Sequence, residues 1–308
     1  MGSPLRLALV GIDRELAATG WAATSSAIEE IEQALSRFRP TSDLVALNDR
    51  AGNPGCEAVH PRLYDALAAA DRAWRLTDGA FDPRILGDLE RLGYPGAAGA
   101  AGRIVGPGRD RAFPDGRWLW RDPRRRALAV AAPVDLGGIG KGLALRWAFA
   151  ALAAALPVLG DGATGALLEA GGDLVARGAA PQDGPWLVAI EDPRTGAEVA
   201  VVAVDRGAVC TSSIGVHAWQ TADGRSVHHL LDPATGEPGG DGLVSVTVAA
   251  DDPAWAEVWS KTLFLEGSGR IGTRARALGL ATWWIGAAGV LEMTPAARVQ
   301  TAWLAAEA

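Results

Sequence analysis

The chain has 308 residues, of which 49% are hydrophobic and 21% are charged, and its formal net charge is −7 at pH 7. This length and apolar content are sufficient for a sizeable hydrophobic core. The acidic balance argues against nucleic acid as a partner, because neutralising phosphates requires clustered lysine and arginine.

The N-terminal segment has one short apolar run, which Arg6 interrupts. No signal-peptide or membrane-spanning pattern follows it, and no lipidation cysteine is present. We therefore expect a cytoplasmic protein that does not insert into a membrane. Cys56 and Cys210 are the only cysteines. Two isolated thiols match neither a metal-ligand spacing nor a disulfide framework.

The first half of the chain is expected to form one strand and then helices. The apolar run 5–10 predicts the strand. Ser26 and Glu29 have the spacing of a capping box, so a helix is expected to begin there and to end at Arg39 and Pro40. The other elements expected in this half are a helix from Pro61, a surface excursion rich in glycine, proline and alanine over 93–115, and strands at 116–120 and 127–131.

The second half is expected to be mostly strands. A helix is expected from about Gly140 to Ala155, and Asp252-Pro253 predicts another over 253–266, because aspartate caps a helix and proline suits its first position. The strand-like runs between them are 166–170, 186–190, 198–204, 207–211, 227–231 and 243–249. This order predicts an α+β fold with a mostly antiparallel sheet, in which two lobes pack as one compact domain over residues 1–308.

A glycine-rich connection between a strand and a helix is the clearest chemical signal. Residues 134–144 read VDLGGIGKGLA. Glycines let backbone amides approach a ligand closely, and the free N–H groups of a helix N-terminus favour phosphate. Lys141 would add a full positive charge. The spacing matches neither a Walker A loop nor a Rossmann fingerprint, and an ordinary glycine-rich turn explains the segment equally well.

Two adjacent histidines precede an Asp-Pro turn. Because successive residues of a strand face opposite sides, only one of His228 and His229 can point into a site. A histidine with the carboxylate of Asp232 nearby is a workable acid/base pair. The alternative is that residues 232–236 only form a turn.

The chain contains two lysines among its 29 basic residues, Lys141 and Lys261. Lysine and arginine differ in shape and hydration, so a site can require a lysine. Lys261 follows Glu257 by four residues on the helix expected at 253–266, in the favourable order for an ion pair. A solvated surface pair is the simpler interpretation of this spacing.

Together these segments resemble the FAD:protein FMN transferase family, also known as the ApbE family. Asp135–Gly142 is similar to the family's Asp-x-Gly-Gly-Ile-Ala-Lys-Gly segment, with Gly140 in place of alanine. Three further segments resemble its Gly-Gly-Asp, Ala-Thr-Ser and His-x-x-Asp-Pro-x-Thr-Gly elements, and two resemble early elements. These segments are 171–173, 210–212, 229–236, 36–48 and 79–83. The likeness runs in order over about residues 25–285.

The resemblance implies a T-fold-like architecture and an enzyme that transfers FMN from FAD to a serine or threonine hydroxyl of an acceptor protein, releasing AMP. It implies that Lys141 lies beside the pyrophosphate and that His229 is the acid/base residue, supported by Asp232. The other residues that it places at FAD are Phe38, Asp82, Asp135, Gly137, Gly138, Gly140, Asp173, Thr211, Ser212 and Lys261. A non-catalytic FAD-binding protein and an FAD pyrophosphatase that uses water remain open alternatives.

The resemblance also implies a Mg²⁺ site, which is altered in this chain. Relatives hold the ion with a backbone carbonyl, here near Gly140, and with an aspartate and a threonine, where this chain has Glu257 and Lys261. A lysine ammonium cannot be a ligand of a hard cation and would repel it. We predict that Lys261 takes the position of the ion. The alternative is Mg²⁺ bound by Glu257 and other oxygen atoms.

Overall fold

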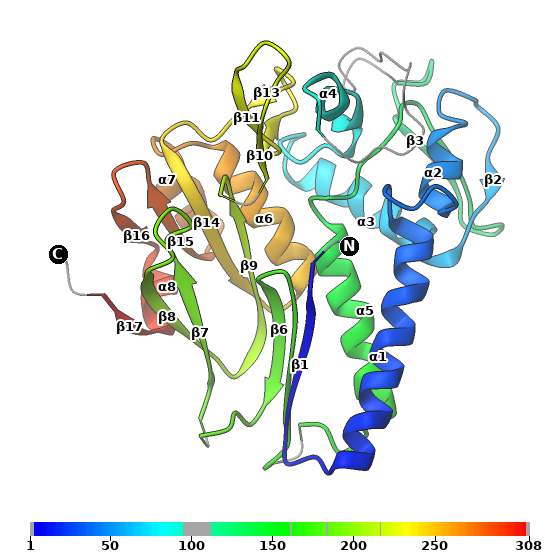
Figure 1. The fold of residues 1–308 in the computed structure, drawn as a ribbon. Helices are drawn as coiled ribbons and strands as arrows, with labels where there is room; N and C mark the ends of the chain where they lie inside the picture. Colours follow the sequence, from blue (N-terminus) through cyan, green and yellow to red (C-terminus); the bar gives the residue numbers. More distant parts are fainter. Residues whose placement is uncertain (1–2, 95–111, 161, 183, 216, 306–308) are drawn as a thin grey trace. The chain divides into compact units, whose positions relative to one another are not determined.

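The computed structural model describes residues 3–94, 112–160, 162–182, 184–215 and 217–305 (Figure 1). The chain divides into two compact units. Unit 1 is formed by Glu29–Gly140 and His217–Gly239. Unit 2 is formed by Gly2–Ile28, Lys141–Val216 and Gly240–Ala308. Both units combine helices with antiparallel strands, as expected for an α+β protein.

The largest sheet of unit 2 has seven strands within the described residues (Figure 1). Its order is β1-β5-β6-β9-β14-β15-β16, and every neighbouring pair is antiparallel. In the same order the strands are Leu5–Val10, Gly165–Ala170, Asp173–Gly178, Arg206–Ser213, Leu243–Ala250, Ala281–Gly286 and Leu291–Met293.

A second, three-stranded sheet of unit 2 has the order β17-β8-β7. Its strands are Thr301–Leu304, Glu198–Val204 and Trp186–Glu191. Every second residue of β8 is buried, as the period of two along a strand requires. One apolar cluster joins the two sheets, with Val202 from this sheet and Leu174 and Trp283 from the larger one.

Two helices of unit 2 matter for the site, α5 (Gly140–Ala155) and α6 (Pro253–Leu265). Helix α6 packs against β9 and β14. Asp252 caps α6 by accepting hydrogen bonds from the N–H groups of Ala254 and Trp255, at 3.0 and 3.2 Å. Arg146 of α5 donates to the same carboxylate at 2.7 Å, which ties the two helices together. The other helices that lie wholly in unit 2 are α7 (Ile271–Ala277) and α8 (Pro295–Gln300).

Helix α1 (Arg14–Leu35) begins twelve residues earlier than the capping box predicts. Asp13 is the residue that starts it, because its Oδ1 accepts hydrogen bonds from the N–H groups of Glu15 and Leu16, both at 2.9 Å. Ser26 lies inside the helix, so the expected start is wrong. The expected end is also late, since the helix stops at Leu35, ahead of Pro40.

Unit 1 holds short elements linked by loops. Its helical elements after α1 are α2 (Asp43–Asn48), α3 (Pro61–Leu76), the 3-10 turn η1 (Pro83–Ile85) and α4 (Leu86–Arg91). One small sheet has the order β2-β4-β3, with strands Glu57–Ala58, Ala127–Val130 and Leu119–Asp122. Two ribbons follow in 217–239, β10 (Ala218–Gln220) with β11 (Ser226–His228) and β12 (Leu231–Asp232) with β13 (Glu237–Pro238).

The expected helices from Gly140 and over 253–266 are confirmed, but the expected strand over 227–231 is wrong. The run 227–231 is broken, because β11 ends at His228 and β12 begins at Leu231. Strand β6 was not expected, since its start at Asp173 reads as a turn. Most of the excursion 93–115 lies outside the described residues. No helix of the described part is long and apolar enough to cross a membrane.

Candidate functional site

The site residues expected from the sequence divide between the two units. Unit 2 holds Lys141, Asp173, Thr211, Ser212, Glu257 and Lys261. Unit 1 holds Phe38, Asp82, Asp135, Gly137, Gly138, Gly140, His229 and Asp232. We describe each group by itself.

In unit 2, Asp173 joins the first turn of α5 to strand β9. Its Oδ2 is ion-paired with the ammonium of Lys141, and its Oδ1 accepts a hydrogen bond from the N–H of Thr211 at 2.9 Å. The side chain of Asp173 is 2% exposed, whereas that of Lys141 is 30% exposed. Three residues that are expected at FAD are therefore in direct contact, and within the ion pair the lysine is the partner that solvent can reach.

The charge of Lys141 is held by its surroundings. Burial opposes the charged form of this ammonium, but the nearby carboxylates of Asp173 and Glu257 outweigh burial and raise the pKa of Lys141. A lysine with a raised pKa stays protonated across the physiological range. The start of α5 thus carries a fixed positive charge.

Glu257 reaches the start of α5 from α6. Its side chain is buried, and its Oε2 accepts a hydrogen bond from the N–H of Gly142 at 2.7 Å. The first N–H groups of a helix have no partner within the helix, so this carboxylate caps α5 from a distance. Its Oε1 has no hydrogen-bond partner among the described residues.

The close approach of α5 and α6 requires glycine at position 142. A Cβ atom there would lie 2.4 Å from the carbonyl oxygen of Pro253 and 2.5 Å from the Cα of Ala254. Both are backbone atoms, which cannot move aside as a side chain does. Gly142 therefore lets the carboxylate of Glu257 reach the N–H groups of α5.

Lys261 lies one helical turn after Glu257 on α6, and both side chains are buried, with exposures of 8% and 4%. The interpretation as a solvated surface pair is therefore wrong. Burial raises the pKa of Glu257 well above its usual range, while the positive charges of Lys141 and Lys261 counteract this rise. Lys261 is thus part of the same buried charge group.

The residues around Glu257 do not fit a Mg²⁺ ion held by side-chain oxygens. The described residues contain no group of three or more His, Cys, Asp or Glu side chains that could hold a metal ion. One oxygen of Glu257 is engaged by Gly142, and the next turn of the helix presents an ammonium where an oxygen ligand would be needed. Mg²⁺ requires a near-octahedral set of oxygen atoms, which this group does not supply.

Two hydroxyl pairs lie beside this charge group. Thr211 Oγ1 and Thr247 Oγ1 are 2.9 Å apart and link β9 to β14. Ser212 Oγ and Ser260 Oγ are also 2.9 Å apart and link β9 to α6. Neighbouring residues of β9 thus face opposite sides of the sheet, with Ser212 buried under the helix.

In unit 1, Asp135 organises the glycine turn before α5. Its Oδ1 accepts a hydrogen bond from the N–H of Gly137 at 2.7 Å, and its Oδ2 is 2.8 Å from Nε of Arg37. A Cβ atom on Gly137 would lie 2.7 Å from that Oδ1, so the turn needs glycine there. Gly138 follows in the same turn, and the N–H of Gly140 bonds to the carbonyl of Leu136 at 2.7 Å.

Arg37 lies between two aromatic rings. Its guanidinium carbon is 4.4 Å from the ring centroid of Phe38 and 4.7 Å from that of Tyr94. Arg37 is buried, and its NH1 has no hydrogen-bond partner among the described residues, whereas Phe38 is 48% exposed. The ring of Tyr94 also contacts Trp219, at 4.8 Å between centroids.

His229 packs against a histidine that the sequence analysis did not single out. Its ring centroid is 5.0 Å from that of His217, edge to face. The backbone N–H of His229 donates to the backbone carbonyl of His217 at 3.2 Å. His228 ends β11, and burial lowers its pKa. Asp232 Oδ1 accepts a hydrogen bond from the N–H of Ala234 at 2.8 Å, so residues 232–236 form a turn. Its support of His229 stays a prediction.

The carboxylate of Asp82 is hydrogen-bonded to Arg84. Its Oδ1 accepts hydrogen bonds from both the backbone N–H and the Nε of Arg84, each at 2.9 Å, and both side chains are buried. The carboxylate thereby starts the η1 turn. A contact of Asp82 with FAD also stays a prediction.

A family model described as the ApbE family matches residues 1–282. This chain belongs to the ApbE family. Among curated ApbE relatives, the FAD:protein FMN transferase of Salmonella typhimurium is 30% identical over 296 residues, covering 92% of this chain and 82% of that protein. The FAD:protein FMN transferase of Escherichia coli K12 is 28% identical with the same coverage.

Solved ApbE structures agree with the fold. The ApbE protein of Thermotoga maritima matches with a TM-score of 0.82 at 25% identity, covering 97% of this chain and 96% of that one. The flavinyl transferase ApbE of Pseudomonas stutzeri matches with a TM-score of 0.76 at 24% identity, covering 97% of each chain. The expected α+β, ApbE-type architecture is therefore confirmed.

Three residues of this ApbE-family chain that contact the expected site residues or one another, Arg37, Tyr94 and His217, were not predicted from its sequence. Arg37 is adjacent to Phe38, which was singled out, so its position carried a signal. Tyr94 lies at the edge of the excursion, and His217 lies twelve residues before His229, where no periodic pattern connects them. The contacts of Tyr94 and His217 with the other residues are evident only in the folded structure.

Proposed function

We propose that this chain binds FAD and transfers its FMN moiety to a serine or threonine hydroxyl of an acceptor protein, releasing AMP. The observation that carries the proposal is the buried charge group at the start of α5, where Lys141 is protonated and partly open to solvent. A helix N-terminus with a fixed cation is suited to binding the pyrophosphate of FAD. This group contains the P–O bond that FMN transfer must break.

Lys141 can engage Asp173 and a phosphate together. An ammonium has three N–H donors, and the contact with Asp173 uses one of them. Asp173 thus fixes the direction of the lysine, and Glu257 fixes the backbone of α5 beside it. Positive charge that is already in place stabilises the charge that develops on the phosphate oxygens without reorganisation.

In the proposed reaction, the acceptor hydroxyl loses its proton to His229 and its oxygen forms a bond to the phosphorus of the FMN half. The bond between that phosphorus and the bridging oxygen breaks, and AMP leaves with the electron pair. His229 is suited to this step because a neutral imidazole accepts a proton near neutral pH. Asp232 contributes by capping the turn that follows His229.

We also propose that Lys261 contributes the positive charge that relatives obtain from a metal ion. It is buried one turn from Glu257, whose pKa its charge lowers. Asp173 and Glu257 together supply at most two negative charges, which the ammonium groups of Lys141 and Lys261 already balance. Adding a divalent cation would leave a buried excess of positive charge, which is unfavourable in a poorly solvated site.

The function is tested by incubating the protein with FAD and a short serine- or threonine-containing acceptor peptide, with Mg²⁺ or with EDTA. We expect AMP release and a peptide whose mass increases by that of the FMN group. AMP release without a change in peptide mass would identify a pyrophosphatase. Tight FAD binding without AMP release would identify a binding protein.

The role of His229 is tested by two neighbouring substitutions. His229→Ala is expected to lower the rate of transfer by roughly 100-fold, the usual contribution of acid/base catalysis, while the Kd for FAD stays nearly unchanged. His228→Ala is expected to have a smaller effect, because its half-buried ring precedes the break between β11 and β12. A larger loss from His228→Ala would assign the proton transfer to that residue instead.

A further inference from the structure

The segment 217–239, which contains His229, is too small to be stable without contacts to the rest of unit 1. Ribbon β10–β11 has three residues per strand and ribbon β12–β13 has two. Isolated two-stranded ribbons are at best marginally stable in water. The position of His229 therefore depends on the contacts that anchor these ribbons within unit 1.

An apolar contact anchors one side of the segment. Leu231 is fully buried in a cluster with Ile85, Leu89 and Leu92, and Trp219 packs against the same cluster. The indole Nε1 of Trp219 also donates to the carbonyl of Leu92 at 2.7 Å. This anchor joins the ribbons to α4 and to the residue that follows it.

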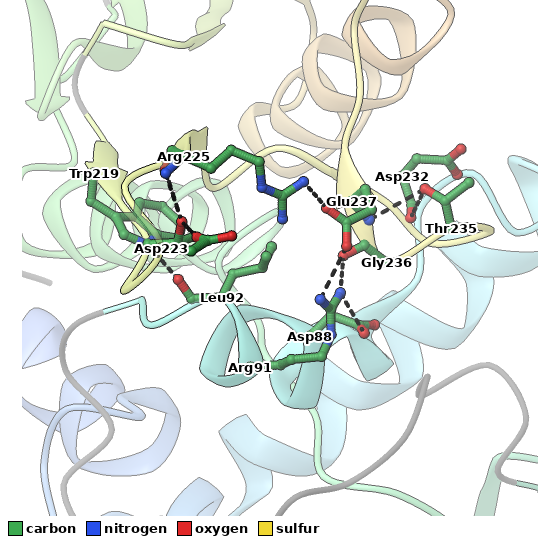
Figure 2. Close-up of polar contacts among 11 residues, drawn as sticks. Asp88, Arg91, Leu92, Trp219, Asp223, Arg225, Asp232, Thr235, Gly236 and Glu237 are labelled. Atoms are coloured by element: carbon green, nitrogen blue, oxygen red, sulfur yellow. Dashed lines mark hydrogen bonds and ion pairs between the residues drawn. The ribbon is translucent and has the colours of Figure 1, made fainter.

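A polar contact anchors the turn after His229 to α4. Arg91, the last residue of α4, donates from NH2 to the carbonyl oxygen of Gly236 at 2.6 Å and from NH1 to Oε1 of Glu237 at 3.0 Å (Figure 2). Its NH2 is also 3.5 Å from Oδ1 of Asp88. The planar guanidinium thus holds a backbone group and a carboxylate at once, which a lysine cannot do in the same geometry.

The turn is closely fitted to α4. Gly236 has φ of +71°, and a Cβ atom there would lie 2.6 Å from Oδ1 of Asp88 and 3.2 Å from NH2 of Arg91. Any other residue at this position would be strained by the positive φ and would displace the side chains of Asp88 and Arg91. Glycine at 236 therefore makes the contact with Arg91 possible.

Glu237 extends the anchor to the other ribbon. Its Oε2 accepts a hydrogen bond from NH1 of Arg225 at 2.7 Å, and Arg225 lies between β10 and β11 (Figure 2). Hydrogen bonds from Arg225 and Arg91 lower the pKa of Glu237, so it is ionised at neutral pH. One carboxylate thereby connects α4 to both ribbons.

We propose that Arg91 and Glu237 form a positioning clamp for His229, which fixes the ribbons on either side of the histidine and so sets where its ring lies for proton transfer. The proposal rests on the proposed role of His229. Neither clamp residue is assigned a contact with the reacting groups. The side chains of Arg91 and Glu237 are 42% and 36% exposed, and exposed ion pairs add little to stability, so positioning is their main consequence.

Steady-state kinetics test the clamp. Arg91→Ala is expected to lower kcat for FMN transfer by about 10-fold to 100-fold, because small misplacements of a catalytic group have effects of this size, with KM for FAD changed by less than about 2-fold. Arg91→Lys should recover part of the loss, and Glu237→Gln should reduce kcat less than Arg91→Ala. Arg50→Ala, which removes a comparably exposed ion pair to Glu57 at 3.1 Å in the same unit, should leave kcat unchanged.

A double-mutant comparison decides whether Arg91 acts through His229. In the His229→Ala background, Arg91→Ala should change kcat by less than about 2-fold. If the two losses multiply, or if Arg91→Ala alone retains the kcat of the unmodified chain, the clamp is disproved while the role of His229 stands. If His229→Ala alone is fully active, the proposed function of His229 fails first and the clamp fails with it.

Histidine NMR spectra give a readout that does not depend on activity. The chain has four histidines, and His60 caps α3 and lies 3.8 Å from Oε1 of Glu30. Arg91→Ala should shift or broaden the ring signals of His217 and His229 and leave those of His60 in place. Unchanged signals for all of these rings would overturn the proposal, and shifts that include His60 would indicate general unfolding, which overturns it as well.

Discussion

At the scale of single residues, Lys141 combines two requirements that usually conflict. It is held by the buried carboxylate of Asp173, yet it remains partly open to solvent. Asp135 shows the opposite arrangement, because Arg37 and Gly137 engage both of its oxygens. Of these two residues of the glycine segment, Lys141 is the one that we propose to contact an anionic ligand.

Lys141→Met is expected to weaken FAD binding by about 10-fold to 100-fold, the usual range for losing a hydrogen bond to a charged group, and to weaken riboflavin binding much less. Riboflavin has no phosphate for the lysine to contact. Isothermal titration with both ligands measures the difference. An equal loss for the two ligands would show that Lys141 acts on the flavin ring or on folding.

The same substitution leaves the carboxylate of Asp173 without its cation. Breaking a buried ion pair costs about 3–5 kcal/mol, although the partial exposure of Lys141 reduces this figure. The double variant Lys141→Met with Asp173→Asn should therefore recover part of the lost stability but not the affinity for FAD. Urea unfolding monitors the first quantity, and the titration monitors the second.

At the scale of secondary structure elements, the crossing of α5 and α6 is the feature that builds the charge group. Glu257 of α6 caps α5 through Gly142, and Arg146 of α5 bonds to Asp252 at the start of α6. Helix α6 thus supplies a hydrogen-bond acceptor to the first turn of α5, and α5 supplies a donor to the residue that caps α6. The two helix starts are fixed together, and Lys141 and Lys261 are fixed with them.

Gly142→Ala is expected to lower the free energy of unfolding by about 1–3 kcal/mol, because its Cβ would overlap backbone atoms of Pro253 and Ala254. The matched control is Gly269→Ala, where nothing lies within 4 Å of the added Cβ. The control should change stability by less than about 1 kcal/mol. Equal effects in urea unfolding would show that the helices separate easily.

The metal prediction also belongs to helix α6. The unmodified chain is expected to show the same rate of AMP release in EDTA as in Mg²⁺, whereas Glu257→Asp with Lys261→Thr should gain Mg²⁺ binding in a calorimetric titration. Tight Mg²⁺ binding by the unmodified chain, with an ion about 2.1 Å from oxygen atoms beside Glu257 in a crystal, would falsify the substitution by Lys261.

At the scale of the whole molecule, the residues assigned to FAD are distributed over both compact units. Unit 2 contains the charge group around Lys141, and unit 1 contains the glycine turn, the aromatic residues around Arg37 and the ribbons with His229. A ligand that binds the folded chain stabilises it by mass action, whichever residues it contacts.

FAD is expected to raise the Tm more than FMN at equal concentration, because FMN lacks the pyrophosphate that Lys141 is proposed to bind. At 100 times its Kd, FAD should stabilise the folded chain by about 2.7 kcal/mol. Differential scanning calorimetry with FAD, FMN and AMP measures the order. Equal shifts for FAD and FMN would remove the pyrophosphate as the recognised group.

Features that depend on residues close together in the chain could be predicted from the sequence alone. Helix α5 has the expected bounds, Gly140–Ala155, and α6 starts where Asp252 and Pro253 predict. A cap or a glycine turn is made by groups two or three residues apart, so its signal is contained in a short window. The expected start at Ser26 was wrong because Asp13 caps an earlier turn and the helix continues through the serine.

Contacts between residues far apart in the chain are evident only in the folded structure. Lys141 and Asp173 are 32 positions apart, Gly142 and Glu257 are 115 apart, and Arg91 and Gly236 are 145 apart. The resemblance to a family named the first four of these residues but gave no partners, and it did not name Arg91 or Gly236 as a pair. Such contacts arise when sheets and helices pack, and packing leaves no periodic pattern in the sequence from which a partner can be read.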